Sequence, residues 1–191
     1  MLRPDFPIKT ERLSLRPYAP EDFDAALEYW SRPDVTRFLY LDAFTPETFV
    51  ERHGILMGRT ELNDEGDVLT LAIVPDGVDQ VVGDVTLFWR SEEHRAGEIG
   101  FILHPDYRGR GFAREASLAM LRMGFEQRGL HRMAGRLDGR NIASAGVLRS
   151  LGMRQEAHLV ENEWVKGAWT DEIIFAMLQS EWLARSRAGY S

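Results

Sequence analysis

The sequence predicts one α/β (α+β) domain in which about four helices flank a mixed central sheet of six to seven strands. Two helix-like segments come early, and three strand-like segments then follow one another with only short turns between them. The second half alternates strand and helix before a closing pair of strands, an order that predicts parallel and antiparallel neighbours in one sheet. A chain of 191 residues is long enough for one such domain and short for two.

The first elements are marked by alternation and by residues that start helices. Leu13 and Leu15 alternate with polar neighbours, which predicts a strand over 11–16. Pro20, followed by two acidic residues, opens the first helix. Thr45, followed by proline, is a typical N-cap and opens the second.

The middle of the chain predicts a three-stranded meander. A turn at 63–67 leads to strands over 68–74, 81–89 and 96–103, with short turns between them. Pro105 ends the third strand because it lacks the amide hydrogen that a sheet ladder needs.

Strands and helices alternate in the last part of the chain. A glycine-rich turn at 108–111 precedes a helix over 112–127, which Gly129 closes. The remaining predicted elements are a strand over 131–138, a helix from near Asn141 to just before Gly152, and strands over 153–164 and 171–178. Residues 184–191 are expected to form a flexible tail.

The composition is that of an ordinary globular protein without cysteine chemistry. Apolar residues make up 44% and charged residues 28%, and no apolar run is long enough to cross a membrane. The absence of cysteine excludes disulfides, cysteine–zinc sites, iron–sulfur clusters and a cysteine nucleophile. The five histidines lack metal-site spacing, so no metal is expected. The first residues lack the features of a secretion signal, which predicts a cytoplasmic protein.

Charge is distributed unevenly along the chain. The formal net charge is −7, yet the segment 108–154 alone carries +7 and the remainder −14. This asymmetry suits an anionic ligand at one place and a cationic ligand at another, while solvated helix-surface arginines are the alternative interpretation. A mostly acidic protein is a poor match for nucleic acid, which needs a positive face.

The glycine-rich turn is the strongest local indication of a ligand site. Residues 108–113, Arg-Gly-Arg-Gly-Phe-Ala, connect a predicted strand to a predicted helix. Glycines let backbone amides converge, and a helix N-terminus adds about half a positive charge, so the turn suits a phosphate or pyrophosphate. The sequence has neither the Gly-Lys-Ser/Thr of a nucleoside-triphosphate loop nor a dinucleotide fingerprint at this turn.

Several short motifs occur in a fixed order along the chain: Thr10-Glu11-Arg12-Leu13 with Leu15-Arg16, Glu98-Ile99-Gly100-Phe101, Arg108 to Ala113, Asn141-x-x-Ser144, Leu151-Gly152-Met153, and Gly167 with Asp171. Together they resemble the GNAT family of N-acetyltransferases, most closely its branch of ribosomal-protein N-terminal acetyltransferases (RimJ/RimL-like). The resemblance covers about residues 8–183 as a single N-acetyltransferase domain. It implies acetyl-CoA bound where two parallel strands splay apart.

The resemblance also implies which residues hold acetyl-CoA. Backbone groups of Phe101, Ile102 and Leu103 would pair with the pantetheine arm. The pyrophosphate would lie on the turn formed by Arg108, Gly109, Arg110, Gly111, Phe112 and Ala113. Asn141 would steady the pantetheine, and a plain helix N-cap is the alternative for this residue.

The implied reaction is direct attack of an amine on the thioester in a ternary complex. Deprotonating a lysine-like amine at pH 7 costs about 4.6 kcal/mol, against about 1.4 kcal/mol for an N-terminal amine. Glu98 and Glu163 are candidate bases, with ordinary strand glutamates as the alternative, and Ser144 is the candidate proton donor to sulfur. Leu148 stands where many family members have tyrosine, which leaves the identity of the acid open.

The acceptor is expected between the segment joining the first two helices and the closing hairpin. Candidate substrate contacts are Trp30, Phe38, Tyr40, Trp164 and Trp169, with core packing or surface aromatics as the alternative for each. The acceptor would be a protein N-terminus or a small cationic amine. A CoA-binding sensor or interaction module without turnover stays open as a different function, as does a homodimer. No nucleic-acid or membrane partner is expected.

Overall fold

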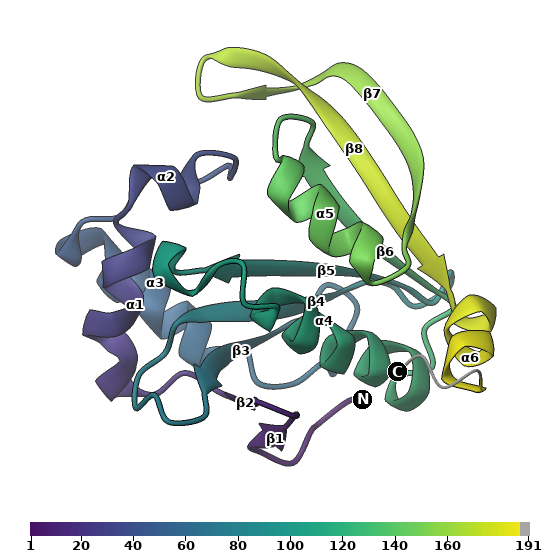
Figure 1. Cartoon of the computed structure of the whole chain (residues 1–191), viewed down its shortest axis with the longest axis horizontal. Coiled ribbons are helices and arrows are strands. Elements are labelled where there is room, and N and C mark those ends of the chain that lie inside the picture. The colour runs from purple at the N-terminus through teal and green to yellow at the C-terminus, as the bar shows by residue number, and fades with distance from the viewer. Residues whose placement is uncertain (188–191) are drawn as a thin grey trace.

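The computed structural model describes residues 1–187, which form a mixed eight-stranded sheet with the order β1-β2-β3-β4-β5-β6-β8-β7 (Figure 1). The α+β class predicted from the sequence is confirmed, with one strand more than the upper expected number. The additional strand, β1 (Ile8–Lys9), has two residues, too few for a periodic pattern. It pairs in antiparallel fashion with β2 (Leu13–Arg16) at the edge of the sheet.

Helices α1 (Phe23–Trp30), α2 (Pro33–Thr36) and α3 (Pro46–Gly58) form the first helical layer. The predicted cap at the start of α3 is confirmed, because the Thr45 hydroxyl oxygen accepts a hydrogen bond from the backbone of Thr48. The single turn α2 was not predicted, since four residues carry too little pattern. The apolar sides of α1 and α3 pack together on one face of the sheet.

The predicted meander is confirmed as β3 (Val68–Pro75), β4 (Gly83–Ser91) and β5 (Ala96–Leu103), all paired in antiparallel fashion. Successive residues of β3 face opposite layers. Ala72 packs against α1 and α3, whereas Leu71 and its alternate neighbours join the core that includes the next long helix. Burial on both faces explains why this strand is apolar except for Thr70, whose hydroxyl is hydrogen-bonded to that of Thr86 at 3.1 Å.

The sheet continues through one parallel contact and a long hairpin. Strand β6 (Arg132–Asp138) runs parallel to β5 and then pairs with β8 (Ala168–Leu178), which pairs with β7 (Arg154–Val165). The β7–β8 hairpin extends beyond the rest of the sheet, and its tip lies on the same side as α2 (Figure 1).

Three helices complete the described chain. Helix α4 (Phe112–Arg122) continues into a π-helical turn (Met123–Gln127), so the helix predicted over 112–127 has the expected extent but a widened end. The other two are α5 (Ile142–Ser150) and α6 (Gln179–Arg187). Helix α6 was not predicted; it includes residues 184–187 of the expected tail, and the rest of that tail lies outside the described residues.

Helix α6 is held by contacts that the local sequence does not reveal. The Trp182 ring stacks on Phe125 at 5.8 Å, and its indole N–H donates to Glu126 at 2.7 Å. Gln179 donates to the backbone oxygen of Phe125 at 2.9 Å. These contacts fasten α6 to the π-helical turn. Within residues 1–187, every helix is too short or too polar to cross a membrane.

Candidate active site

The parallel strands β5 and β6 separate halfway along their length. Their paired residues are Ala96–Arg132, Gly97–Met133 and Glu98–Ala134, and the pairing ends there. The following residues of β5, including Phe101, remain paired with β4 on the other side. Residues 99–103 therefore present a strand edge to the gap, where backbone groups can pair with an extended ligand.

The glycine-rich turn lies at the far end of this strand edge. Gly109 and Gly111 have φ angles of 74° and 84°, a left-handed conformation that side chains with a Cβ adopt at a cost. Gly111 is the N-cap of α4, so the first amides of that helix lack intrahelical acceptors. A Cβ at Gly111 would lie 3.2 Å from Nη2 of Arg12, so the Arg12 side chain packs closely against the backbone of the turn. This geometry fits a pyrophosphate.

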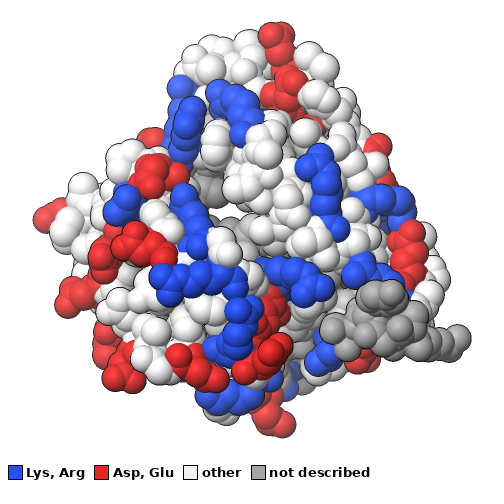
Figure 2. Space-filling view, viewed as in Figure 1, with Lys and Arg blue, Asp and Glu red and all other residues white. Residues whose placement is uncertain are grey.

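The two arginines of the turn also hold its shape. Nε of Arg108 donates to the backbone oxygen of Leu103 at 3.3 Å, and Arg110 donates to that of Asp106 at 2.9 Å. The Arg110 guanidinium lies 5.0 Å from the centre of the Tyr107 ring. Basic side chains gather around a hollow in the middle of the face shown in Figure 2. Arg108 and Arg110 thus place positive charge at the end of the free strand edge.

Asn141 and Ser144 begin α5 at the opposite side of the gap. The Asn141 side-chain oxygen accepts the backbone amide of Ser144 at 3.1 Å, which confirms the N-cap interpretation. No hydrogen bond occupies the Ser144 hydroxyl among the described residues, so it is available to a ligand atom. Leu148, in contrast, is only 2% exposed and packs tightly over Gly135.

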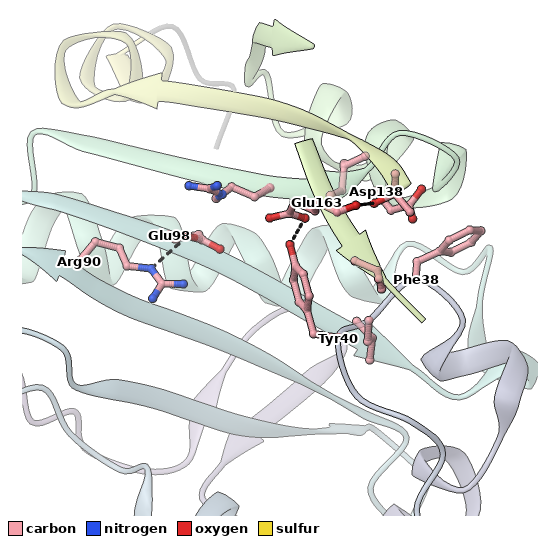
Figure 3. A pocket seen from close by; sticks show the side chains of 11 residues that line it. Phe38, Tyr40, Arg90, Glu98, Asp138 and Glu163 are labelled. Carbon is pink, nitrogen blue, oxygen red and sulfur yellow. Dashed lines mark hydrogen bonds and ion pairs between the residues drawn. The ribbon is translucent and has the colours of Figure 1, made fainter. Parts of the chain in front are cut away.

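A cavity of about 550 Å³ lies beside the point where the strands separate (Figure 3). Three parts of the chain bound it: the segment between α2 and α3 (residues 37–44), one face of the central sheet and the β7–β8 hairpin. Its lining residues are Phe38, Leu39, Tyr40, Arg90, Glu98, Arg136, Leu137, Asp138, Glu163, Val165 and Thr170. The predicted Glu98 and Glu163 are therefore brought together with Phe38 and Tyr40 in one cavity.

Arginine–carboxylate pairs link neighbouring strands on the side of the sheet that faces the cavity. Arg90 of β4 donates to Glu98 of β5 at 3.0 Å, and Arg136 of β6 donates to Glu172 of β8 at 2.6 Å. Glu172 is 1% exposed and also accepts from Asn162 at 3.0 Å. The hydrogen bond from Arg136 to Glu172 is the main reason why the pKa of Arg136 is raised. Buried charge at Glu172 is thus paired and hydrogen-bonded.

Glu163 has a different partner. The Tyr40 hydroxyl donates a hydrogen bond to its carboxylate, as Figure 3 shows. Partial desolvation raises the pKa of Tyr40, and the hydrogen bond to Glu163 raises it further. A tyrosine with a raised pKa stays neutral at pH 7, so Glu163 has a hydrogen bond but no compensating positive charge from this partner.

The remaining aromatic predictions are not brought together at the cavity. Trp30 is 1% exposed and packs against Phe44 and Arg52 in the helical layer, so the structure gives it a core position in place of the expected substrate contact. Trp164 and Trp169 are exposed on the hairpin, with ring centres 5.4 Å apart, and are not among the lining residues.

Sequence reasoning did not single out Arg90, Arg136, Asp138 or Thr170 as cavity residues. Alternation along the meander could have placed Arg90 on the same face as Glu98, because Glu98 pairs with Phe88 and Arg90 follows two positions later on β4. Arg136 and Thr170 depend on how β8 inserts between β6 and β7, which a single sequence does not reveal. No cluster of potential metal-binding side chains occurs within residues 1–187.

A free strand edge runs from the point where β5 and β6 separate, beside the cavity, to the glycine-rich turn at the start of α4. This combination suits an acyltransferase that takes its acyl group from a coenzyme A thioester. The description "Acetyltransferase (GNAT) domain" belongs to the family model that matches residues 12–154. The chain belongs to the GNAT acetyltransferase family and is an acetyl-CoA-dependent N-acyltransferase.

Individual relatives and solved structures are similar to this chain over most of its length. An uncharacterised N-acetyltransferase of Bacillus licheniformis is 31% identical over 173 residues, which cover 91% of this chain and 96% of that protein. The crystal structure of a GNAT-family acetyltransferase from Bacillus anthracis superposes with a TM-score of 0.81 at 30% identity, covering 91% of this chain and 99% of that one. The spermidine N(1)-acetyltransferase of Escherichia coli K12 is 24% identical over 92% of this chain and 90% of its own length.

Proposed function

We propose that this protein acetylates a small cationic amine, which enters the cavity between the 37–44 segment and the β7–β8 hairpin. Acetyl-CoA supplies the acetyl group as a thioester. Backbone groups of Phe101, Ile102 and Leu103 at the free edge of β5 bind its pantetheine arm, and the 108–113 turn binds its pyrophosphate. Asn141 caps α5 and steadies the same arm.

The lack of a direct ion pair at Glu163 supports the choice of acceptor. Of the carboxylates that line the cavity, Glu98 pairs with Arg90 and Asp138 with Arg140, at 3.0 and 2.6 Å. Glu163 has only the neutral Tyr40 as a direct partner in the described structure. An ammonium group of the acceptor would give Glu163 a directly paired cation, in addition to the more distant charge of Arg136. The likeness to a spermidine N(1)-acetyltransferase favours an acceptor of this kind.

Removal of the amine proton is the main chemical task of the cavity. A primary amine with a pKa near 10.4 needs about 4.6 kcal/mol for deprotonation at pH 7, whereas release of a thiol-like group needs only about 2 kcal/mol. Glu98 is the last residue of β5 that pairs with β6, at the mouth of the gap, and acts as the base directly or through water. Glu163 then serves chiefly to hold the cationic acceptor. The free hydroxyl of Ser144 is placed to protonate the departing sulfur.

The first experiment separates binding from turnover. A thermal melt in acetyl-CoA at about 100 times its dissociation constant should stabilise the protein by about 2.7 kcal/mol, a rise of roughly 5–10 °C. Release of CoA should then be measured with spermidine, with a lysine-containing peptide acetylated at its N-terminus and with an unblocked ribosomal-protein N-terminal peptide. Spermidine turnover that falls at least tenfold in Glu163→Gln is the expected result.

Each other result has a defined meaning. Turnover of the unblocked peptide alone would replace the small amine with a protein N-terminus as the acceptor. Stabilisation without turnover of any of the three amines would favour the sensor function over the proposed reaction. Glu161→Gln is the matched control, because Glu161 is an exposed glutamate on the same strand and does not line the cavity.

A further inference from the structure

The 37–44 segment, which forms one wall of the acceptor cavity, is fixed by helices only at its ends. Near its start, the Leu39 amide donates to the Thr36 oxygen at 2.9 Å, and at its end the Phe44 amide donates to the Trp30 oxygen at 3.1 Å. Between them, Tyr40 is 70% exposed and the Asp42 side chain is 91% exposed. The middle of this wall therefore depends on contacts from elsewhere in the chain.

Lys166, at the tip of the β7–β8 hairpin, contacts the segment at two places. Its Nζ donates to the backbone oxygen of Thr36 at 2.8 Å and lies 3.6 Å from Oδ1 of Asp42. The backbone of Lys166 has a φ of 50° and that of Gly167 a φ of 80°, the conformation of a tight two-residue hairpin turn. A short turn of this kind fixes the direction in which the lysine leaves the hairpin.

The burial of the Lys166 side chain supports an ordered contact. Only 31% of its side chain is exposed, although the residue lies at the end of a protruding hairpin. A long, flexible side chain loses conformational entropy when it is held in this way, so compensating interactions must be present. The hydrogen bond to Thr36 and the ion pair with Asp42 are those interactions, and the charged donor strengthens the hydrogen bond.

Two other contacts join the same wall to the opposite side of the cavity. The Tyr40 hydroxyl binds Glu163, and the Arg140 guanidinium lies 5.9 Å from the centre of the Phe38 ring. Tyr40, Glu163 and Phe38 all line the cavity, whereas Lys166 does not. Lys166 therefore acts on the wall from outside, through its contacts with Thr36 and Asp42.

We propose that Lys166 is a positioning residue for the acceptor amine, because it fixes the 37–44 segment so that Phe38 and Tyr40 close the cavity and Tyr40 reaches Glu163. The inference rests on the proposed function for the identity of the occupant as an amine. Among the described residues, the hydrogen bond and the ion pair of Lys166 go to Thr36 and Asp42, and neither reaches the 99–103 strand edge or the 108–113 turn. Its loss should therefore weaken acceptor binding and leave acetyl-CoA binding unchanged.

The first test follows the motion of the wall and needs no turnover. Amide hydrogen exchange of residues 37–44 should be compared by mass spectrometry in the wild type, Lys166→Met and Lys9→Met. Lys9, the only other lysine of the sequence, pairs with Asp76 at 3.9 Å and belongs to edge strand β1. We expect about tenfold faster exchange in Lys166→Met and no change in Lys9→Met. Wild-type exchange in Lys166→Met would overturn the inference.

The second test distinguishes positioning of the acceptor from a general loss of structure. With spermidine as the acceptor, Lys166→Met should raise the KM for spermidine about tenfold while the KM for acetyl-CoA stays within twofold. Lys166→Arg, which retains the charge, should restore most of the spermidine affinity. Equal increases in both KM values, or a fall in kcat alone, would contradict a positioning role.

The two tests also separate this inference from the proposed function. If exchange of the 37–44 segment accelerates in Lys166→Met but the wild type acetylates no amine, the proposed function fails and the restraint of the wall by Lys166 is supported. If the wild type acetylates spermidine and Lys166→Met has wild-type KM values and exchange, the function stands and the role of Lys166 is overturned.

Discussion

Glu115, in the first turn of α4, binds Arg12 through both the backbone and the side chain of that arginine, although the two residues are 103 positions apart. The Arg12 amide lies 2.7 Å from one carboxylate oxygen, and Nε and Nη2 lie 2.8 and 2.7 Å from the other. Nη1 of Arg12 donates to the backbone oxygen of Arg110 at 2.9 Å. The Thr10 hydroxyl also donates to Glu115, at 2.6 Å. The N-terminal motif thus supports the glycine-rich turn.

Glu115→Gln should disturb this support and weaken acetyl-CoA binding. Burial raises the pKa of Glu115, but the hydrogen bonds from Thr10 and Arg12 outweigh it and hold the pKa below its ordinary value. Loss of the charge should reduce the free energy of unfolding by about 1–3 kcal/mol. The KM for acetyl-CoA should rise several-fold and the KM for the amine should not. Denaturant unfolding and steady-state kinetics measure the two effects.

The control for this change is Glu93→Gln, which alters an exposed glutamate in the turn between β4 and β5. It should leave stability and both KM values unchanged. An acetyl-CoA KM unchanged in Glu115→Gln would show that the N-terminal strand supports the fold without shaping the cofactor turn.

Gly111→Val should abolish stabilisation by acetyl-CoA. The φ of 84° at Gly111 is unfavourable for a β-branched residue, and its Cβ would lie 3.2 Å from Nη2 of Arg12. The rise in melting temperature expected for the wild type with acetyl-CoA, about 5–10 °C, should be absent. Gly146→Ala is the control, because a Cβ there meets nothing within 4 Å and the position is helical. It should keep the full rise.

Much of the architecture follows from local sequence patterns. The alternation of Leu13 and Leu15 located β2, and the Thr45–Pro46 pair located the start of α3. The glycine-rich turn and the helix after it were also predicted, because positive φ angles and a helix N-terminus both leave a local mark on the sequence. Strand β1, with two residues, and α2, with a single helical turn, were missed because each is too short to show its hydrophobic period.

The cavity could be predicted only in part. Glu98, Glu163, Phe38 and Tyr40 were named and line it, but the hydrogen bond between Tyr40 and Glu163 joins residues 123 positions apart. Trp30 illustrates the limit of prediction from sequence. Its aromatic ring suits either a core or a substrate site, and only the packing of α1 on α3 shows that it belongs to the core. The contact of Lys166 with Thr36 joins residues 130 positions apart, and no local pattern reports it.

Leu148→Tyr should destabilise the protein without supplying a proton donor. Leu148 is 2% exposed on α5, and its side chain lies 2.8 Å from where a Cβ of Gly135 would be. A larger ring has no room there, so we expect a loss of about 1–3 kcal/mol in unfolding free energy. Val147→Tyr, on the same helix at a less buried position, should cost less. Faster turnover in Leu148→Tyr would show that this helix can adopt the arrangement of relatives with tyrosine here.

Asp84 should make stability depend on pH in the direction opposite to most carboxylates. It is 3% exposed on β4, accepts a hydrogen bond from Tyr18 at 2.9 Å, and Tyr18 in turn contacts Tyr29. Burial raises the pKa of Asp84 from 3.8 to about 6, although Tyr18 and the nearby Arg52 and Arg59 lower it. The folded protein therefore binds this proton more tightly than the unfolded chain does between about pH 4 and 6.

Tighter proton binding in the folded state means that the contribution of Asp84 to stability is greatest near pH 4 and falls as the pH rises through 6. A shift of about two pK units corresponds to about 3 kcal/mol as an upper value. Asp84→Asn keeps an acceptor for Tyr18 and removes the buried charge, so its stability relative to the wild type should increase from pH 4 to pH 7 by about 1–3 kcal/mol. Urea unfolding across this range measures the difference, with Asp79→Asn as an exposed control that should show none. A constant difference between Asp84→Asn and the wild type would mean that Arg52 and Arg59 fully compensate the charge, and that Asp84 is ionised throughout the range.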